Sequence, residues 1–227
     1  MQVEGKQEVH KIVTGVTASM ALLEAACKAN ADAILVHHGY FWRGENQAIV
    51  GIKKRRIQFL LENDINLFAY HLPLDAHAEF GNNVMLGKVL GLPITAYLDD
   101  KNMLPYAELK QPQTLQSVVN DVTIKLGRVP QVISNQTGGD DKKSIKTIAW
   151  CTGAAQGYIE QAIAASIDVY ISGEISEQTV HSARESATSY IAAGHHVTER
   201  YGIQALGEHL AQKFDLAHEF IDMDNPV

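Results

Sequence analysis

The sequence predicts an α/β protein built from two similar halves. Two observations lead to this fold class. Apolar runs of strand length alternate with helical patterns, an order typical of parallel strands joined by crossover helices. The pattern that opens the chain then returns in its second half. A chain of 227 residues is long enough to bury roughly 70% of its unfolded surface, so it needs no disulfide to fold.

The first half contains the clearest strand–helix–strand unit. Lys11 to Val16 reads as a strand that enters a turn, and Ser19 is a suitable N-cap for the helix that follows and closes at Ala29-Asn30. Ala33 to Val36 is predicted to be a second, buried strand. Further predicted elements are a helix at Ile52–Asn63, a strand at Ile65–Tyr70, and a helix at Asn83–Leu90 that Gly91 and Pro93 end.

A proline-containing segment separates the halves. It carries a predicted helix at Leu115–Leu126, a short strand near Val129–Ile133, and the polar loop Asn135–Lys143, which is the best linker in the chain. We therefore expect a first lobe at 1–97, a connecting segment at 98–144 and a second lobe at 145–227.

The second half repeats the first in its predicted elements and in several residues. Lys146–Trp150 is a predicted strand, Gly157–Ala165 a helix and Val169–Ser172 a strand. A shift of 136 positions aligns Ala18, Glu24, Ala26, Ala29 and Asp32 with Ala154, Glu160, Ala162, Ala165 and Asp168. A shift of 124 positions aligns His71 with His195 and Asp75 with Glu199. Shared order with weak identity indicates an internal duplication, with both halves contributing to one site.

Composition limits the classes of partner and the compartment. The net charge of −7 argues against a nucleic-acid backbone as the main partner. The two cysteines are too few for a disulfide framework, and Cys27 lies on an apolar helical face, where a buried structural thiol is expected. No apolar run approaches the length of a membrane span, and the first residues lack the features of a signal peptide. We expect a cytoplasmic protein with no membrane partner.

Histidines and carboxylates follow three of the predicted strands, and they carry most of the functional information. His37-His38 follow Ala33–Val36, His71 and Asp75 follow the strand that ends at Tyr70, and His195-His196 with Glu199 follow an apolar run at 190–193. Ligands of α/β sheets gather beyond the carboxyl ends of the strands. Three strands that bring imidazoles and carboxylates to this edge predict a metal site.

The spacing of these residues favours two ions. Adjacent strand residues point to opposite faces, so His37 and His38 bind one ion only if the chain turns there, which Gly39 would permit; otherwise each binds its own ion. A helix that begins at His195 would place Glu199 on the same face, from which its carboxylate could bridge both ions. The spacing from His71 to the acid at 75 is the same, but Pro73 predicts a loop there.

These ligand types favour zinc, iron, manganese or nickel, and the sequence does not choose among them. A water held between two such ions would be a nucleophile near neutral pH, so we expect metal-assisted hydrolysis. The plainer alternative is that each cluster is a hydrogen-bonded turn, but three clusters at equivalent strand ends favour the metal. A different functional class, a non-catalytic metal-binding scaffold or metal-handling factor, also fits.

Two further polar residues are candidates to orient the metal ligands or to carry protons. Glu174 occupies the repeat position of His38, and His181 follows it by about two helical turns. A capping glutamate and a solvent-facing histidine are equally compatible with the pattern. We expect the remaining histidines to lie at the surface; they are His10, His77, His209 and His218.

Two other runs leave alternatives open. Lys53-Lys54-Arg55-Arg56 would spread around a helix, and a solvated face is favoured over a contact with an anionic substrate. Tyr40-Phe41-Trp42 is a dense aromatic group. It could pack over the mouth of the site or at a subunit contact, or it could stack a planar ring. No Walker or dinucleotide fingerprint is present.

Three ordered segments resemble the Nif-three-like family, whose bacterial members carry the name GTP cyclohydrolase 1 type 2 homologue. The segments are Val36-His37-His38-Gly39-Tyr40-Phe41-Trp42, His71-Leu72-Pro73-Leu74-Asp75-Ala76-His77 and Gly194-His195-His196-Val197-Thr198-Glu199-Arg200; Ser172 to Gln178 adds to them. The resemblance spans essentially the whole chain. Related bacterial chains carry a first helix ahead of the segment that begins at Gln2, and assembly that depends on this helix is affected if it is absent.

The resemblance implies two similar, intertwined α/β lobes with a dinuclear metal centre between them, and assembly of six copies into a toroid. It also implies roles for individual residues. His37, His38, Asp75, His195 and Glu199 match the family's metal ligands, and His71 and His196 match positions that line the site. A small nucleotide-like or heterocyclic molecule is the expected substrate.

Overall fold

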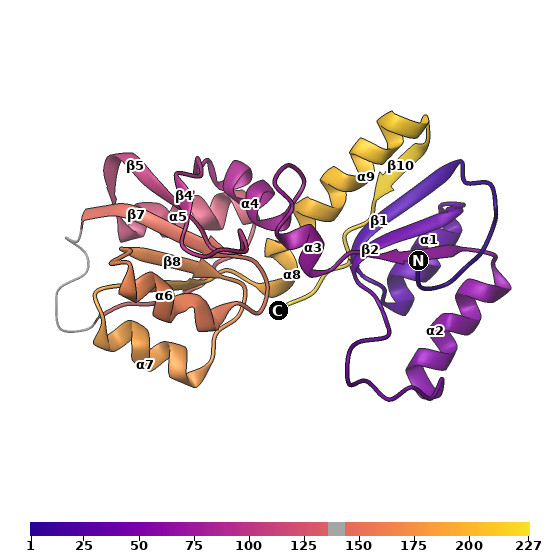
Figure 1. The fold of residues 1–227 in the computed structure, drawn as a ribbon, viewed down its shortest axis with the longest axis horizontal. Helices are drawn as coiled ribbons and strands as arrows, with labels where there is room; N and C mark the ends of the chain where they lie inside the picture. The colour runs from indigo at the N-terminus through magenta and orange to yellow at the C-terminus, as the bar shows by residue number, and fades with distance from the viewer. Residues whose placement is uncertain (136–143) are drawn as a thin grey trace. The chain divides into compact units, whose positions relative to one another are not determined.

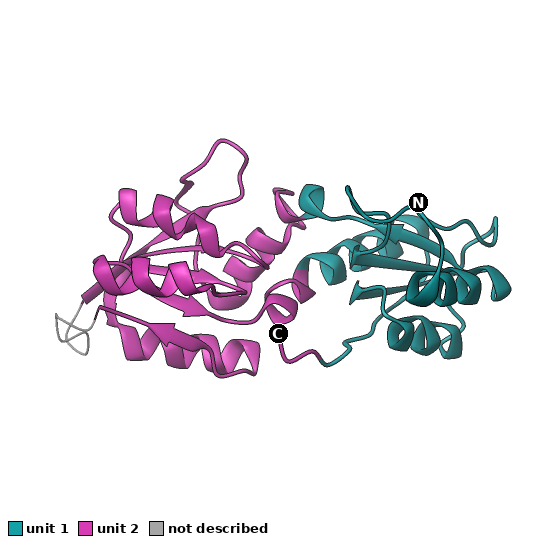
Figure 2. Cartoon of the chain, turned by 90° about the horizontal axis from the view of Figure 1, so that it is seen from below, with its two compact units in different colours: residues 1–74, 202–224 teal, residues 75–201, 225–227 magenta. Residues whose placement is uncertain are grey.

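Two β-sheets organise the chain, one in each of two units (Figure 1). The computed structural model describes residues 1–135 and 144–227. Unit 1 comprises residues 1–74 and 202–224, and unit 2 comprises residues 75–201 and 225–227 (Figure 2). Helices pack on both sheets, which confirms the predicted α/β class.

Unit 1 is a four-stranded parallel sheet with the order β10-β1-β2-β3. Its strands are β1 (Lys11–Thr17), β2 (Ala33–His38), β3 (Asn66–Ala69) and β10 (Ala217–Phe220). Its helices are α1 (Met20–Lys28), α2 (Gly51–Glu62) and most of α9 (Arg200–Phe214). Strands β1 and β2 read as nearly continuous apolar runs because helices cover both of their faces.

Alternating residues of β1 and β2 pack against different helices. Val13 and Ile34 belong to a core with Leu22 of α1 and Leu60 of α2. Their sequence neighbours face the opposite layer, where Ile203 of α9 covers the sheet. This alternation follows from the two-residue period of a strand, whose successive side chains point to opposite faces of the sheet.

Unit 2 is a six-stranded mixed sheet with the order β4-β5-β7-β8-β9-β6. Its strands are β4 (Ala96–Tyr97), β5 (Pro105–Thr114), β6 (Gln131–Ile133), β7 (Ser144–Cys151), β8 (Val169–Ser172) and β9 (Ser189–Ala192). Strands β7, β8 and β9 are parallel to one another, and the outer strands pair antiparallel. Its helical segments are α4 (Asn82–Leu90), α5 (Leu115–Leu126), η2 (Gln156–Tyr158), α6 (Ile159–Ala164), α7 (Glu177–Glu185) and α8 (His195–Thr198).

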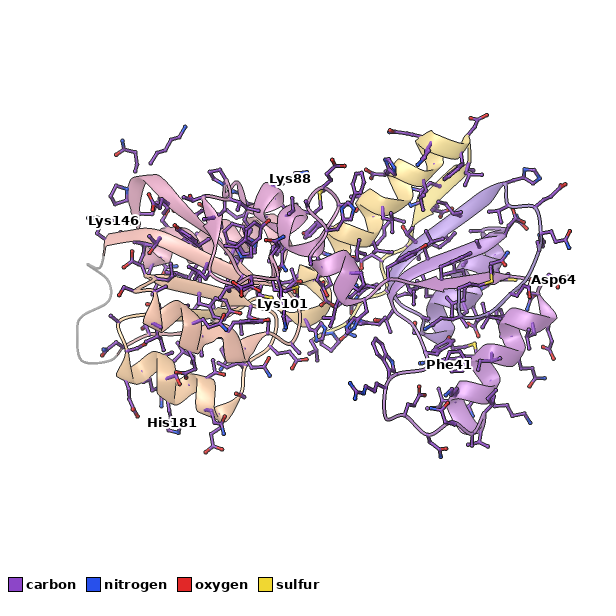
Figure 3. The ribbon with its side chains drawn as sticks, viewed as in Figure 1. Phe41, Asp64, Lys88, Lys101, Lys146 and His181 are labelled. Carbon is purple, nitrogen blue, oxygen red and sulfur yellow. The ribbon has the colours of Figure 1, made fainter. Side chains whose placement is uncertain are left out.

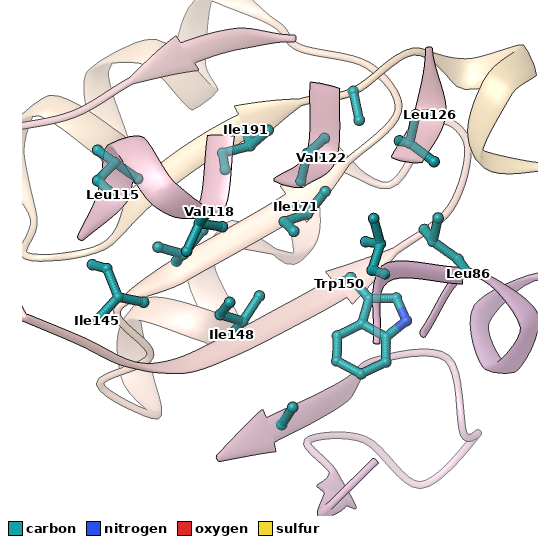
Figure 4. Packing of buried hydrophobic residues seen from close by; sticks show 14 of the residues in the cluster. Leu86, Leu115, Val118, Val122, Leu126, Ile145, Ile148, Trp150, Ile171 and Ile191 are labelled. Carbon is teal, nitrogen blue, oxygen red and sulfur yellow. The ribbon is translucent and has the colours of Figure 1, made fainter. Parts of the chain in front are cut away.

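The two faces of the unit 2 sheet have separate cores. Helices α4 and α5 pack on one face around Trp150, whose indole N–H donates to the backbone oxygen of Asn83 at 2.8 Å (Figure 4). Helices α6 and α7 cover the other face, where Tyr170 and Tyr190 are fully buried. The buried Trp150 ring therefore holds α4 against the strands of this sheet, which end at the candidate site.

The duplication expected from the sequence is visible in the topology. In each unit three consecutive strands pair in parallel, β1-β2-β3 in unit 1 and β7-β8-β9 in unit 2, with a helix after the first strand. The C-terminal strand β10 returns to pair with β1, so unit 1 contains chain from both ends. The units differ in their bounds from the lobes expected at 1–97 and 145–227, because residues 202–224 belong to unit 1 and residues 75–97 belong to unit 2.

Several local expectations are corrected by the structure. Residues 72–75 form the short helix α3 (Leu72–Asp75) rather than a loop, because proline is tolerated in a first helical turn, where no backbone N–H is needed. His37 and His38 lie inside β2, not after it. Cys27 is only partly buried, whereas Cys151 is the buried thiol. Strands β4 and β5 were not expected, and most of the loop predicted at Asn135–Lys143 falls outside the described residues.

Across the described ranges, no helix is long and apolar enough to cross a membrane.

Candidate metal centre

Three imidazoles meet at the carboxyl ends of neighbouring strands in unit 1. His37 and His38 close β2, and His71 follows β3, which pairs with β2. One ring nitrogen of each histidine lies within 4.8 Å of one nitrogen of the other two. The His37 ring centroid lies 4.6 Å from that of His38 and 5.1 Å from that of His71. We name His37, His38 and His71 the histidine triad.

Hydrogen bonds within unit 1 orient two of these rings. Nδ1 of His37 lies 2.8 Å from the backbone oxygen of Tyr70, and Nδ1 of His38 lies 3.2 Å from the hydroxyl of Thr17. A carbonyl oxygen can only accept, so Nδ1 of His37 carries the proton. In the neutral ring Nε2 then holds the lone pair, the tautomer that a metal ligand needs.

Unit 2 supplies a mixed set of one imidazole and two carboxylates, which we name the acidic set: Asp75, His195 and Glu199. Nε2 of His195 lies 3.1 Å from Oε2 of Glu199, which confirms that the helical spacing from 195 to 199 places both on one face. A carboxylate oxygen of Asp75 lies within 4.8 Å of one of Glu199. Two carboxylates at this separation repel each other unless a cation or a proton lies between them.

Asp75 is held by polar neighbours of its own unit. Its Oδ1 accepts a hydrogen bond from the Asn82 amide at 2.8 Å and lies 3.4 Å from the hydroxyl of Thr152. The Asn83 side chain contacts both the backbone oxygen of Asp75 and the amide of Thr152. Asn82, Asn83 and Thr152 were missed by the sequence analysis. Asparagines at a helix start ordinarily serve as caps, so no sequence signal marked their contact with Asp75.

Glu174 positions His195. Its Oε1 lies 2.7 Å from Nδ1 of His195, so the ring is held between Glu174 and Glu199. The bond to Glu199, opposed by burial and supported by Glu174, raises the pKa of His195 to about 9. In a metal-binding histidine, a carboxylate that accepts from Nδ1 fixes the tautomer in which Nε2 binds the metal. The geometry thus gives Glu174 an orienting contact, which is one of the two functional roles that the sequence suggested.

Gly153 provides the space that Glu199 occupies. Its φ of +67° lies in the left-handed region, and a Cβ at this position would lie 2.1 Å from Oε1 of Glu199 and 3.1 Å from Nε2 of His195. Its backbone amide donates to the hydroxyl of Thr198 at 3.1 Å. Glycine is therefore required here on two grounds, backbone conformation and close approach.

The other two predicted site residues are placed differently. His181 lies on the exposed part of α7 (Figure 3), and within the described residues no contact between it and the acidic set is seen. His196 is buried in α8, and its backbone amide donates to the backbone oxygen of Val227 at 3.0 Å.

Both sets fit a divalent ion. Imidazole nitrogens and carboxylate oxygens without thiolate suit zinc, iron, manganese or nickel. The ring nitrogens of the histidine triad are as close as ligands of one ion require, and the adjacent carboxylates of the acidic set supply the negative charge that a cation neutralises. The predicted ability to bind metal is therefore supported in each unit by itself.

Comparison with known proteins gives consistent matches over the whole chain. The family model described as Duf34/NIF3 (NGG1p interacting factor 3) matches residues 1–226. A Pseudomonas aeruginosa protein named GTP cyclohydrolase 1 type 2 homolog is 54% identical over 230 aligned positions, which cover 100% of this chain and 89% of the relative. An Escherichia coli protein of the same name is 47% identical over 100% of this chain and 90% of its own.

Solved structures agree with these matches. A chain described as protein ybgI, of unknown function, has a TM-score of 0.94 and 48% identity, covering 100% of this chain and 90% of its own. The protein TTHA1606 from Thermus thermophilus has a TM-score of 0.87 and 34% identity, covering 100% of this chain and 88% of its own. The predicted fold is confirmed by these structures.

Proposed function

Because this chain belongs to the Duf34/NIF3 family, we propose that it is a dinuclear metal-dependent hydrolase acting on a small nucleotide-like or heterocyclic substrate. The observation that carries the proposal is the pair of ligand sets, one in each unit. The histidine triad lies at the ends of β2 and β3, and His195 and Glu199 of the acidic set follow β9, the third parallel strand of unit 2 as β3 is of unit 1. The cytoplasm is the expected compartment.

The proposed ligands come from both sets. His37 and His38 would supply imidazoles, and Asp75, His195 and Glu199 would supply one imidazole and two carboxylates. The complementarity of the sets supports this assignment, because three neutral imidazoles carry no charge to balance two divalent ions and the acidic set does. Covalent connection supports it too: the chain passes from unit 1 to unit 2 between Leu74 and Asp75.

The protein's own groups prepare this site. Two divalent ions, when bound, would supply Lewis acidity and lower the pKa of water to near neutrality. Glu174 holds the Nδ1 proton of His195, and the backbone oxygen of Tyr70 holds that of His37, so both rings present Nε2. The Asn82 amide holds Asp75 in place. These contacts orient ligands before any ion arrives, which reduces the cost of binding it.

Metal analysis combined with turnover tests the proposal. Protein expressed without added metal and purified without chelators should hold about two ions per chain, measured by plasma mass spectrometry. GTP, suggested by the name of the relatives, and a panel of cyclic amides should be assayed before and after chelation. We expect Glu199→Gln to abolish turnover and Glu185→Gln, an exposed residue of α7, to leave it unchanged.

The outcomes separate the two functional classes. Loss of turnover on chelation, with recovery on metal return, would support a hydrolase. Ions retained at near-stoichiometric level without turnover of any panel member would favour the scaffold or metal-handling function. Protein that neither holds nor takes up divalent ions would contradict both.

We further propose that the chain assembles with itself into a homohexamer, as the family resemblance implies. The test is sedimentation velocity on the full chain. A species of six times the 24.9 kDa chain mass would support the assembly, and a concentration-independent monomer would contradict it.

A further inference from the structure

Trp42 stands beside the histidine triad and outside the hydrophobic core of unit 1. Its ring centroid lies 4.6 Å from that of His71, edge to face at 76°, and 6.1 Å from that of His38. The neighbouring Tyr40 belongs to the core cluster, but Trp42 does not, and 39% of Trp42 remains exposed. A large apolar ring left partly in water beside polar imidazoles is not explained by core packing.

The backbone before Trp42 directs the ring toward the triad. Phe41 has a φ of +63°, in the left-handed region that residues other than glycine rarely adopt. The reversal lets Tyr40 enter the core, where its hydroxyl donates to the backbone oxygen of Ala18 at 2.8 Å, while Trp42 reaches His71 two residues later. Strain of this kind persists where surrounding contacts hold it in place.

One lysine of the basic run provides those contacts. Nζ of Lys53 lies 4.6 Å from the centroid of the Phe41 ring and 3.2 Å from Oε1 of Glu45. The other carboxylate oxygen of Glu45 accepts from the backbone amide of Trp42 at 2.9 Å. Lys53, with only 11% of its side chain exposed, thus clamps the aromatic loop onto α2, whereas Lys54 is exposed. The basic run is therefore not a uniform solvated face.

We propose that Trp42 is the wall of the substrate site on which a planar heterocyclic ring stacks, and that Lys53 holds this wall in position. The inference rests on the proposed function and deepens it by naming the substrate feature that the protein recognises. An indole offers a flat, polarisable face to any aromatic ring, including that of a nucleic-acid base. Its contact with His71 places a stacked ring next to the ligands rather than elsewhere on the surface.

Binding of guanosine tests the stacking role, with ribose as the probe that lacks a ring to stack. The 227-residue chain is used, and its metal content is measured in parallel. The emission of Trp42 is the part of the tryptophan emission that is lost in Trp42→Phe, because the second tryptophan, Trp150, is fully buried and common to both proteins. We expect guanosine, but not ribose, to quench this emission. Equilibrium dialysis should show guanosine affinity lowered about tenfold in Trp42→Ala and less in Trp42→Phe, which keeps an aromatic face.

Lysine variants separate positioning from general charge effects. Lys53→Met should weaken guanosine binding and shift the Trp42 emission, while Lys54→Met, which removes the same charge from the next residue, should do neither. Wild-type affinity in Trp42→Ala, or equal effects of the two lysine variants, would overturn the proposal. Guanosine binding that depends on Trp42, in a protein that neither holds nor takes up divalent ions, would leave the stacking role intact and contradict the proposed metal-dependent function instead.

Discussion

Asp32 and Asp168 perform the same task in the two units. Oδ2 of Asp32 accepts from the backbone amide of Lys11 at 3.0 Å, and Oδ2 of Asp168 accepts from that of Thr147 at 3.1 Å. Each aspartate stands just before the second parallel strand and accepts from a backbone amide of the first. Alanine-rich helices resemble one another by chance, but a shared carboxylate contact between equivalent strands does not follow from composition. The contact is strong evidence for the duplication.

We expect Asp32→Asn and Asp168→Asn each to destabilise the chain by roughly 1–2 kcal/mol, because a neutral amide accepts more weakly than a carboxylate from backbone N–H groups. Asp100→Asn, at an exposed position, is the matched control. Urea unfolding followed by circular dichroism measures the difference. An Asp168 variant as stable as the control would show that the second contact is incidental.

The stability contributed by Asp32 should depend on pH. Burial alone would raise the pKa of this carboxyl, but hydrogen bonds from Lys6 and from the amides of His10 and Lys11 lower it to about 2. A depressed folded-state pKa means that the contribution is complete above the unfolded value near 4 and is lost as pH falls toward 2.

Urea unfolding midpoints of the wild type and Asp32→Asn should therefore differ at pH 7, differ as much at pH 5, and converge between pH 4 and pH 2. A gap that stays constant down to pH 2 would indicate that charge at Asp32 is unimportant.

Much of the fold follows from sequence, because its strands and helices obey local rules. Ser19 caps α1 as predicted, accepting from the amide of Leu22, and Gly91 ends α4 in the left-handed conformation. The short edge strand β4 and the long strand β5 beside it escaped prediction since their residues are partly exposed and lack a clear alternation. Pairing with β7, a strand that is distant in sequence, fixes β5 in the sheet.

The site shows the same division between local and distant information. The spacing from His195 to Glu199 predicted their contact because it is local. The partner of Asp75 at position 152 could not be predicted, since 77 residues separate the two and only the folded sheet brings them together. His218 was expected at the surface, yet its Nε2 lies 2.8 Å from the hydroxyl of Thr14, because β10 returns to pair with β1.

Gly153→Ala should disable the acidic set. The new methyl group would meet the Glu199 carboxylate and would impose a side chain on a backbone with positive φ, so we expect lower metal content and a destabilisation of about 1 kcal/mol or more. Gly157→Ala is the matched control, because open space surrounds its Cβ position and its φ is not positive. Metal analysis and thermal unfolding of both variants measure the effect.

The two readouts separate site damage from general damage. Normal metal content in Gly153→Ala would mean that Glu199 moves aside without loss, and would argue against its role as a ligand. Loss of metal in Gly157→Ala as well would point to a global effect on unit 2.

Glu174→Gln should weaken metal binding without unfolding the protein. The glutamine oxygen can still accept from Nδ1 of His195, so the ring stays in place, but the neutral amide no longer increases the basicity of Nε2 as the carboxylate does. We expect divalent-ion affinity to fall by about 10- to 100-fold, the usual effect of removing such a partner. Glu177→Gln, an exposed residue at the start of α7, provides the same charge change without the contact.

Competition dialysis against a chelator of known affinity measures this effect for zinc and for manganese. The affinities for the two ions should be compared. Only the affinity for the ion held by His195 should fall, while the affinity for the ion held by the histidine triad should stay the same. Equal weakening of both ions would mean that binding at the acidic set and binding at the triad are coupled. Unchanged affinity for both would remove His195 from the ligands and leave Glu174 as a structural partner only.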